Sequence, residues 1–259
     1  MPEQSKTLVI SSAEQLFRPS TRRDFLRVLG LGGTMMMLPS VFTACDDTTV
    51  IPTSTSATTY TLDLSNDIGI LNYAFALEQL EAAYYTAALS SAGFTQLNAN
   101  EQEVLGDLQK HEVIHREFFR TVLGSAAIPN LNFNTTTVGT LTATRAVLLS
   151  TSQLLEDTGV SAYNGAGKYL TNAANLLVAG KIVSVEARHA AAIRDLRDAT
   201  GRLFAGDDVV GATGLDVKAE PGTVGSAVNG LNVVVGTIAI GTQPDQSKKT
   251  ADVTAPTPT

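Results

Sequence analysis

The sequence predicts an all-α protein whose main part is a four-helix bundle. Four long segments are rich in Ala and Leu and carry apolar residues at spacings of three and four, the periodicity of a helix with one buried face. The connections between them are short, long and short in that order, which is typical of a bundle with one long crossover. The motif Glu-x-x-His occurs twice and uses two of the three histidines in the chain.

The N-terminal part of the chain has the features of an export signal. Residues 20–27 read Ser-Thr-Arg-Arg-Asp-Phe-Leu-Arg, which resembles the twin-arginine (Tat) consensus. The apolar stretch that follows over residues 28–38 is too short and too rich in glycine to span a membrane. We therefore expect residues 1–44 to be a Tat signal peptide and the mature protein to reach the cell envelope or periplasm.

Cys45 is the only cysteine and directly follows this segment. A lone cysteine cannot form an internal disulfide, and its position resembles the cleavage site of a lipoprotein. The alternative, cleavage at a small-x-small pattern, fits poorly with Phe42. The pattern favours lipid attachment at Cys45, which would anchor the protein to a membrane.

The mature chain is acidic. Removal of residues 1–44 takes away five of the 18 Lys and Arg and three of the 25 Asp and Glu, which leaves a net charge of −9. The sequence shows no basic patch, and this argues against a nucleic-acid partner. Residues 45–62 are rich in Ser, Thr and Pro and are expected to be a linker.

The bundle itself is expected over residues 63–201. Ser65 can cap the first helix and Gly93 follows it, while Asn100 with Glu103 resembles a capping box for the second helix, which Gly124 ends. The predicted helices cover residues 66–91, 101–123, 142–164 and 170–199. Residues 202–242 form an extension with a short helix over 221–231 and a strand over 233–240, and the polar tail 243–259 is expected to be disordered.

The two Glu-x-x-His motifs are Glu112 with His115 and Glu186 with His189. Residues three apart lie on one face of a helix, so each pair can direct a carboxylate and an imidazole toward the same point. Two such helices, with one glutamate from each of two more, form the inward-facing dinuclear metal site of a four-helix bundle.

The other two helices supply the missing glutamates. Glu78 and Glu156 are each followed, seven residues later, by a tyrosine, Tyr85 and Tyr163 respectively. The chain therefore contains two similar helix pairs, each in the order Glu…Tyr and then Glu-x-x-His. We expect the two tyrosines either to serve the site as hydrogen-bond donors or redox-active catalytic residues, or to be core tyrosines with satisfied hydroxyls.

The repeat also separates two candidates on the first helix. Glu81 lies one turn after Glu78 and could face the same cavity, but Gly159, which cannot bind a metal, holds the corresponding place. We expect Glu78 to be the ligand and Glu81 an alternate ligand or a residue behind the ligands.

Charge favours metal ions in this interior. Four carboxylates inside a bundle would cost several kcal/mol per ion in desolvation and repulsion. Two divalent cations would cancel their charge, and a set of carboxylate oxygens with two imidazole nitrogens suits Fe or Mn. The predicted ligands are Glu78, Glu112, His115, Glu156, Glu186 and His189.

Residues 64–201 resemble the ferritin-like superfamily, in particular exported ferritin-like domain proteins related to plant desiccation-related proteins. The resemblance is carried by the segments 77–85 (LEQLEAAYY), 155–163 (LEDTGVSAY) and 186–190 (EARHA), and by Glu112 with His115. It implies a bundle that holds two metals with the same six residues. In cage-forming ferritins such a centre oxidises ferrous iron, but the linker, the lipid site and the extension depart from those subunits.

We therefore expect a dinuclear Fe or Mn protein of the cell envelope that reacts with O₂ or peroxide, in the manner of a ferroxidase or a peroxide-detoxifying enzyme. One alternative is a non-catalytic bundle that protects the envelope under desiccation or other stress. Another is a zinc protease, because residues 111–115 read His-Glu-x-x-His, although no His-x-x-Gly-x-x-His continuation follows and Glu156 could be a third ligand only across the crossover. With a dinuclear site instead of a zinc site, His111 is expected either to be exposed or to lie behind the ligands. A homo-oligomer is an open alternative to a monomer.

Overall fold

The computed structural model describes residues 58–198, 200–245 and 247. The predicted signal peptide, Cys45, residues 45–57 of the predicted linker and most of the predicted tail lie outside these residues. No helix in the described part of the chain is both long enough and apolar enough to cross a membrane.

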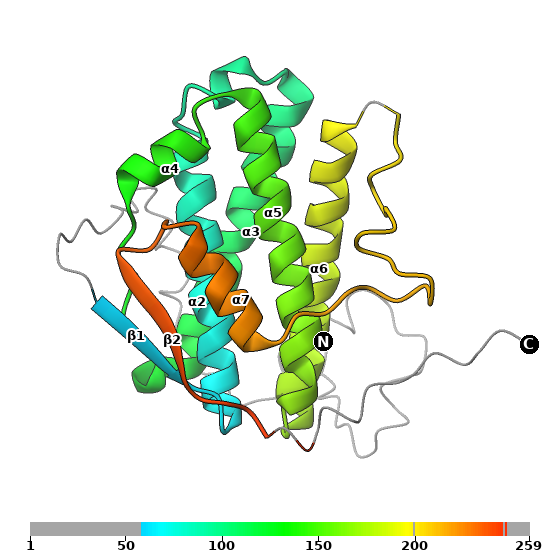
Figure 1. Ribbon diagram of the computed structural model, residues 1–259. Coiled ribbons are helices and arrows are strands. Elements are labelled where there is room, and N and C mark those ends of the chain that lie inside the picture. The colour runs from blue at the N-terminus through cyan, green and yellow to red at the C-terminus, as the bar shows by residue number, and fades with distance from the viewer. Residues whose placement is uncertain (1–57, 199, 246, 248–259) are drawn as a thin grey trace, which may run out of the picture. The chain divides into compact units, whose positions relative to one another are not determined.

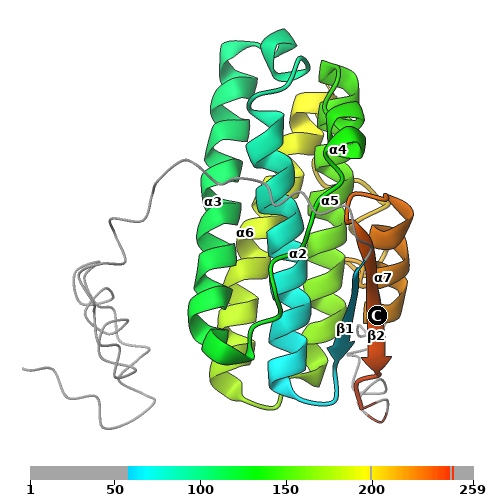
Figure 2. The same cartoon turned by 90° about the vertical axis from the view of Figure 1, so that its left-hand side faces the viewer.

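Four long helices lie side by side and form the bundle (Figures 1 and 2). They are α2 (Asp67–Ala88), α3 (Ala99–Leu123), α5 (Arg145–Ala166) and α6 (Ala173–Arg197). The most extensive helix contacts join α2 to α3 and α5 to α6, which are the two pairs expected from the short connections. The short 3₁₀ turns η3 (Phe94–Gln96) and η5 (Gly167–Tyr169) lie within those connections. The predicted fold class is confirmed.

The helices start at caps that differ from the expected ones. α2 follows Asn66 rather than Ser65, and the capping box of α3 is formed by Asn98 and Glu101 rather than by the pair two residues later. α5 begins only after Thr144, whose hydroxyl accepts the N–H of Val147. In each case the chosen residue is the one whose side chain bonds an otherwise unpaired amide of the first turn.

The α6 helix begins at Ala173 instead of residue 170 because a distant carboxylate holds the preceding turn. Asp67, at the start of α2, accepts the backbone N–H groups of Thr171 at 2.8 Å and Asn172 at 3.0 Å. It also accepts the Thr171 hydroxyl and the Asn175 amide. One side chain thus fixes the starts of two helices relative to each other.

The helix α2 is the centre of the molecule. Every residue from Gly69 to Tyr85 is buried, because the strand β1 (Thr58–Asp63) and the crossover contact α2 in addition to α3 and α5. The only charged residues of this helix are Asp67, Glu78 and Glu81, as expected for a helix buried on all sides. The two glutamates therefore stand in an apolar surrounding.

The long crossover runs along α2 and is tied to it by two amides (Figure 2). Ile128 donates its N–H to Asn72 at 2.7 Å, and Leu131 donates to Gln79 at 2.8 Å. The crossover contains the turn η4 (Gly124–Ala126) and a short helix, α4 (Thr135–Leu141). Part of the segment predicted to be irregular is therefore helical.

Two short strands join the two ends of the described chain. β1 (Thr58–Asp63) pairs in parallel with β2 (Gly236–Thr242), and the buried side chains of Tyr60 and Leu62 are part of the core. β1 thus begins inside the segment assigned above to a linker, and β2 is shifted toward the C-terminus from the expected strand. Gly69 permits the close turn from β1 into α2, since a Cβ there would lie 1.5 Å from the carbonyl oxygen of Asp63.

The C-terminal extension packs on the bundle. The helix α7 (Pro221–Gly230) lies against α5 and β2, and Val224 and Val228 belong to the same core as the bundle (Figure 1). Ala219 donates its N–H to the carbonyl of Ser161 at 2.9 Å. Gly165 makes this approach possible, because a Cβ at that position would lie 1.8 Å from the Ala219 carbonyl oxygen.

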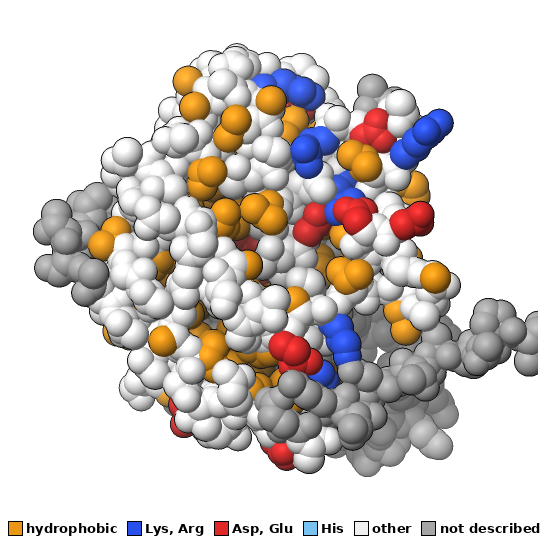
Figure 3. Space-filling view, viewed as in Figure 1, with side chains coloured by type: hydrophobic (Ala, Val, Ile, Leu, Met, Phe, Trp, Pro, Cys, Tyr) orange, Lys and Arg blue, Asp and Glu red, His pale blue; other side chains and the backbone are white. Residues whose placement is uncertain are grey.

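A buried arginine ties the segment after α6 to the bundle. Arg194 is 2% exposed and bonds both Asp157 of α5 and Asp208 of the extension, each at 2.7 Å from Nη2. Figure 3 shows basic and acidic side chains gathered together on the right-hand part of this face, where the segment after α6 lies in Figure 1. The extension is therefore held by specific polar contacts as well as by apolar packing.

Candidate metal centre

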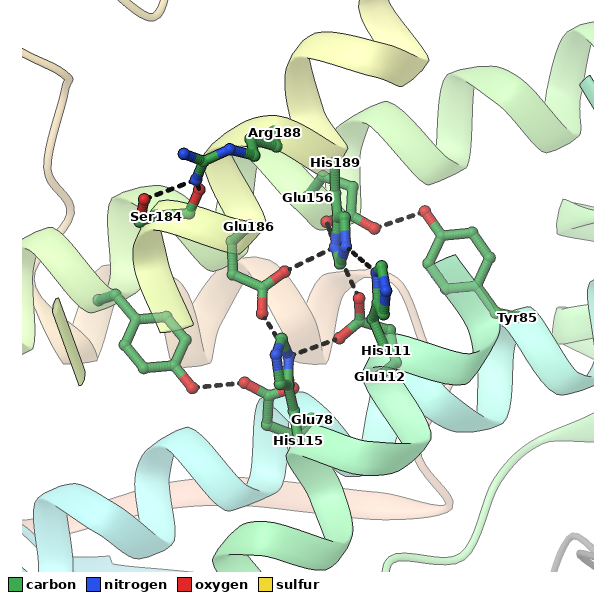
Figure 4. A network of polar contacts seen from close by, with 11 residues as sticks. Glu78, Tyr85, His111, Glu112, His115, Glu156, Ser184, Glu186, Arg188 and His189 are labelled. Carbon is green, nitrogen blue, oxygen red and sulfur yellow. Dashed lines mark hydrogen bonds and ion pairs between the residues drawn. The ribbon is translucent and has the colours of Figure 1, made fainter. Parts of the chain in front are cut away.

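Six side chains from four helices meet in the interior of the bundle and point toward one another in Figure 4. The helices α2 and α5 each contribute one glutamate, while α3 and α6 each contribute a glutamate and a histidine one turn further on. All six predicted ligands are brought together: Glu78, Glu112, His115, Glu156, Glu186 and His189.

The first half of the cluster surrounds His115. Its Nδ1 lies 2.8 Å from a carboxylate oxygen of Glu186, 3.4 Å from Glu78 and 3.5 Å from Glu112. One donor atom from each of these four residues lies within 4.8 Å of the others, so the group can hold a metal ion.

The second half surrounds His189 in the same way. Its Nδ1 lies 2.8 Å from Glu112, 3.0 Å from Glu186 and 3.4 Å from Glu156. These four residues form a second group with the same spread of donor atoms. Glu112 and Glu186 belong to both groups, so the two groups of potential ligands overlap.

The carboxylates are fully removed from water and incompletely satisfied. Glu78, Glu112, Glu156 and Glu186 are each 0% exposed. Both oxygens of Glu112, and one oxygen of each of the other three, have no partner with hydrogen-bond geometry within the described chain. Buried polar atoms without partners are costly, and oxygen-rich groups of this kind fit hard divalent cations. The residues present therefore fit a metal centre.

Protons stabilise the cluster when it holds no cation. Burial by itself lowers the pKa of His115, but its contacts with Glu112, Glu186 and Glu78 outweigh this and raise the pKa to about 12. The pKa of His189 is raised to about 12 by its contacts with Glu112, Glu156 and Glu186, again against the effect of burial.

The carboxyl groups divide into two kinds. Burial raises the pKa of Glu156 to about 8 and, together with the charge of Glu186, raises the pKa of Glu78 well above its usual range. Burial acts in the same sense on Glu112, but its close contacts with His115 and His189 overcome it and hold the pKa of Glu112 at about 2.

The two tyrosines cross between the helix pairs. Tyr85 of α2 donates its hydroxyl to Oε1 of Glu156 on α5 at 2.6 Å, and Tyr163 of α5 donates to Oε1 of Glu78 on α2. In both glutamates Oε2 is the oxygen that faces the histidine. Each tyrosine therefore holds one oxygen and leaves the other directed into the cluster, which is the hydrogen-bonding role considered in the sequence analysis.

Glu81 is buried but stands outside both groups. It is 3% exposed and makes no hydrogen bond or ion pair with the described residues. Its Oε1 lies 3.0 Å from the place that a Cβ of Gly159 would occupy. Burial, and then the charges of Glu112 and Glu156, raise the pKa of Glu81 well above its usual range. It therefore lies behind the ligands, in space that glycine leaves free on α5.

His111 is exposed, and it also contacts the cluster. Its Nδ1 lies 2.9 Å from Nε2 of His189, and the two rings are nearly parallel, with centroids 5.1 Å apart. Burial, followed by the charges of His189 and His115, lowers the pKa of His111. The sequence analysis left its exposure and its contact with the ligands as alternatives, whereas the structure combines them.

The zinc-protease alternative requires His111 and His115 to bind one ion. Among the described residues, His111 belongs to neither group of potential ligands. Glu112 belongs to both groups, whereas the glutamate of a His-Glu-x-x-His zinc site activates water and does not bind the ion. The geometry therefore favours the carboxylate-rich centre over a His-Glu-x-x-His zinc site.

The fold and the site define a class of protein: a four-helix bundle with a buried cluster of glutamates and histidines that can hold metal ions. The family model for the ferritin-like domain matches residues 66–199, more than half of the chain, and the protein belongs to this family. The search of curated proteins finds no match.

Proposed function

We propose that the protein binds two Fe or Mn ions in the bundle and that the loaded centre takes part in redox chemistry with O₂ or peroxide. One observation carries the proposal. Glu112 and Glu186 belong to both four-residue groups, and this overlap of two groups of donor atoms supports two adjacent cation positions. Within each position the ligands would be a terminal glutamate, a histidine and the two shared carboxylates.

The residues of this chain have separate tasks in the proposal. Glu112 and Glu186 span the two positions, while His115 and His189 each present Nδ1 to one of them. Tyr85 and Tyr163 keep Glu156 and Glu78 from rotating. When bound, Fe or Mn would supply one-electron redox chemistry that no side chain of the cluster provides.

The arrangement also limits access. The four glutamates are 0% exposed, whereas the side chain of His115 is 12% exposed and His111 beside it is exposed. Small molecules would therefore reach the centre past α3, which suits O₂ or peroxide better than a large organic substrate. A catalytic redox role of Tyr85 and Tyr163, beyond the hydrogen bonds described, is part of this proposal.

Metal binding is the first test. The full-length protein, stripped of metal, is titrated anaerobically with Fe²⁺ and separately with Mn²⁺, and bound metal is counted. We expect two ions per chain. Glu112→Gln should lower this number, because it removes a charge from both positions, whereas Glu103→Gln on the exposed face of the same helix should not.

Reactivity is the second test. The Fe²⁺-loaded protein is mixed with O₂ or with hydrogen peroxide, and consumption of the oxidant is compared with that of Glu112→Gln. Two ions bound without oxidant consumption above background would reject the redox part. Less than one ion per chain, with the same melting temperature in chelator, would reject the metal centre and favour the non-catalytic protective bundle.

We also propose that the protein is exported by the Tat route and held at the envelope membrane through Cys45. The support is the sequence of residues 20–27 and the lone cysteine after the apolar stretch. Cys45→Ser should move the protein from the membrane fraction to the soluble fraction of the envelope. An unchanged distribution would argue against the anchor.

A further inference from the structure

The two halves of the cluster are related by the internal repeat, and their contacts obey it. Tyr85 contacts Glu156 as Tyr163 contacts Glu78. His115 of α3 lies 2.8 Å from Glu186 of α6, and His189 of α6 lies 2.8 Å from Glu112 of α3. Residues at equal places in the two Glu-x-x-His helices can therefore be compared directly.

The repeat is broken immediately before each shared glutamate. His111 precedes Glu112 on α3, while Val185 precedes Glu186 on α6. A histidine has a nitrogen that accepts or donates a hydrogen bond, whereas valine has neither. The two metal positions therefore differ in what lies behind their histidines.

His111 makes use of this difference. His189 directs Nδ1 toward three carboxylates, and its outer nitrogen, Nε2, lies 2.9 Å from Nδ1 of His111. The rings are nearly parallel, with an interplanar angle of 5°. When Nε2 of His189 carries a hydrogen and donates it to His111, Nδ1 is the nitrogen left free for a cation.

His115 has no such support. Its Nδ1 faces the carboxylates, but its outer nitrogen bonds no protein group among the described residues. A ligating histidine whose second nitrogen donates to a protein acceptor is fixed in orientation and becomes a stronger base, and loss of that acceptor typically weakens metal affinity about 10- to 100-fold.

We propose that His111 is a positioning residue that makes the two metal positions unequal. It orients His189, so the position formed with Glu112, Glu156 and Glu186 fills first and holds its ion more tightly. The position at Glu78 and His115 fills second. This inference rests on the proposed dinuclear centre and adds an order of loading to it.

The test is a stepwise anaerobic titration of the metal-free, full-length protein with Mn²⁺, in which binding is measured by calorimetry and by electron paramagnetic resonance. The wild-type protein should show two binding steps of different affinity. His111→Val reproduces the residue found at the equivalent place on α6, and it should weaken the tighter step by about 10- to 100-fold. The two steps would then nearly coincide.

Two further variants separate positioning from simple packing. His111→Asn keeps an acceptor near Nε2 of His189 and should retain much of the difference between the steps. Val185→His offers an acceptor to His115 and should tighten the weaker step. Neither prediction would follow if His111 only filled space on an exposed helix face.

The outcomes also separate this inference from the proposed function. If the wild-type protein binds no Mn²⁺, the dinuclear centre itself is wrong. If it binds two ions but His111→Val leaves both steps unchanged, the centre stands and the role of His111 is refuted. Equal weakening of both steps in His111→Val and His111→Asn would also overturn the inference, because it would indicate a structural role.

Discussion

Loading the metal-free protein with Mn²⁺ at pH 7 should release about three protons per chain, because the side chains that would bind the cations hold protons in their absence. With pKa values of about 12, His115 and His189 are protonated at this pH. Glu156, with a pKa of about 8, is mostly protonated. Glu112, with a pKa of about 2, has no proton to lose.

The sign and size of the pH dependence follow from this count. The loaded protein carries fewer protons than the metal-free protein, so binding becomes tighter as the pH rises. Each released proton contributes about 1.4 kcal/mol per pH unit, and three contribute about 4 kcal/mol per pH unit for the two ions together. This dependence should become shallower above pH 8, where Glu156 has lost its proton before binding and only the two histidines still release protons.

The same groups set the stability of the metal-free protein. The folded pKa of Glu156 is raised from 4.5 to about 8, so its contribution is complete below pH 4.5 and is lost as the pH rises through 8. The contributions of His115 and His189, raised from 6.5 to about 12, are complete below pH 6.5 and are lost at higher pH. Removal of metal should therefore lower the melting temperature more at pH 8 than at pH 6.

The assay is calorimetric titration in several buffers of different ionisation enthalpy at one pH, from which the number of protons released is obtained directly. Glu156→Gln should release about one proton fewer than the wild-type protein, while Glu103→Gln on the surface of α3 should match the wild type. Release of fewer than one proton per chain, with two ions bound, would refute the protonated cluster.

Three further predictions concern the frame around the centre. Gly165→Ala should lower the free energy of unfolding by about 1–3 kcal/mol, since its Cβ would meet the Ala219 carbonyl at 1.8 Å, whereas Gly180→Ala, with open space around it, should not destabilise the protein in denaturant titrations. Burial opposes ionisation of Asp67, but hydrogen bonds from Thr171 and its neighbours hold its pKa at about 2. The stabilisation by the ionised Asp67 is present above pH 3.8 and is lost as the pH falls through 2. Asp67→Asn should therefore lower the free energy of unfolding more at pH 7 than at pH 2, and equal losses would contradict this. Tyr163→Phe should weaken Mn²⁺ binding by about tenfold in the same calorimetric titration, because it frees a terminal carboxylate to rotate, and an unchanged affinity would make the hydroxyl a packing group only.

The comparison of sequence and structure is most informative at the helix starts. The four helices and their pairing follow from apolar periodicity and loop length, both of which are readable over a few turns of chain. The helices begin at other residues than predicted, because several neighbouring asparagine, serine and threonine residues can each serve as the N-cap. The choice of Asn98 over Asn100 depends on Glu101, which also bonds Arg145 of α5 at 2.5 Å. A contact between distant helices thus helped to decide a local boundary.

The strand β1 shows a different case, in which residues 58–63 alternate polar and apolar side chains but nothing local indicates the strand with which they pair. Residues 58–63 follow a Ser/Thr-rich segment and resemble a linker, yet they pair with residues 236–242 near the other end of the described chain. Parallel pairing over such a separation depends on where α7 and the crossover place the second strand. Local composition carries no information about that placement.

The sequence by itself determined the four helices and the identities of the side chains that share their inner faces, because residues three and seven apart on a helix are placed by local geometry alone. Only the tertiary structure decided which tyrosine bonds which glutamate, that Glu81 occupies the space left by Gly159, and that His111 reaches His189. These contacts join different helices, and their distances depend on how the rigid helices pack against one another. No spacing within a single segment encodes that packing.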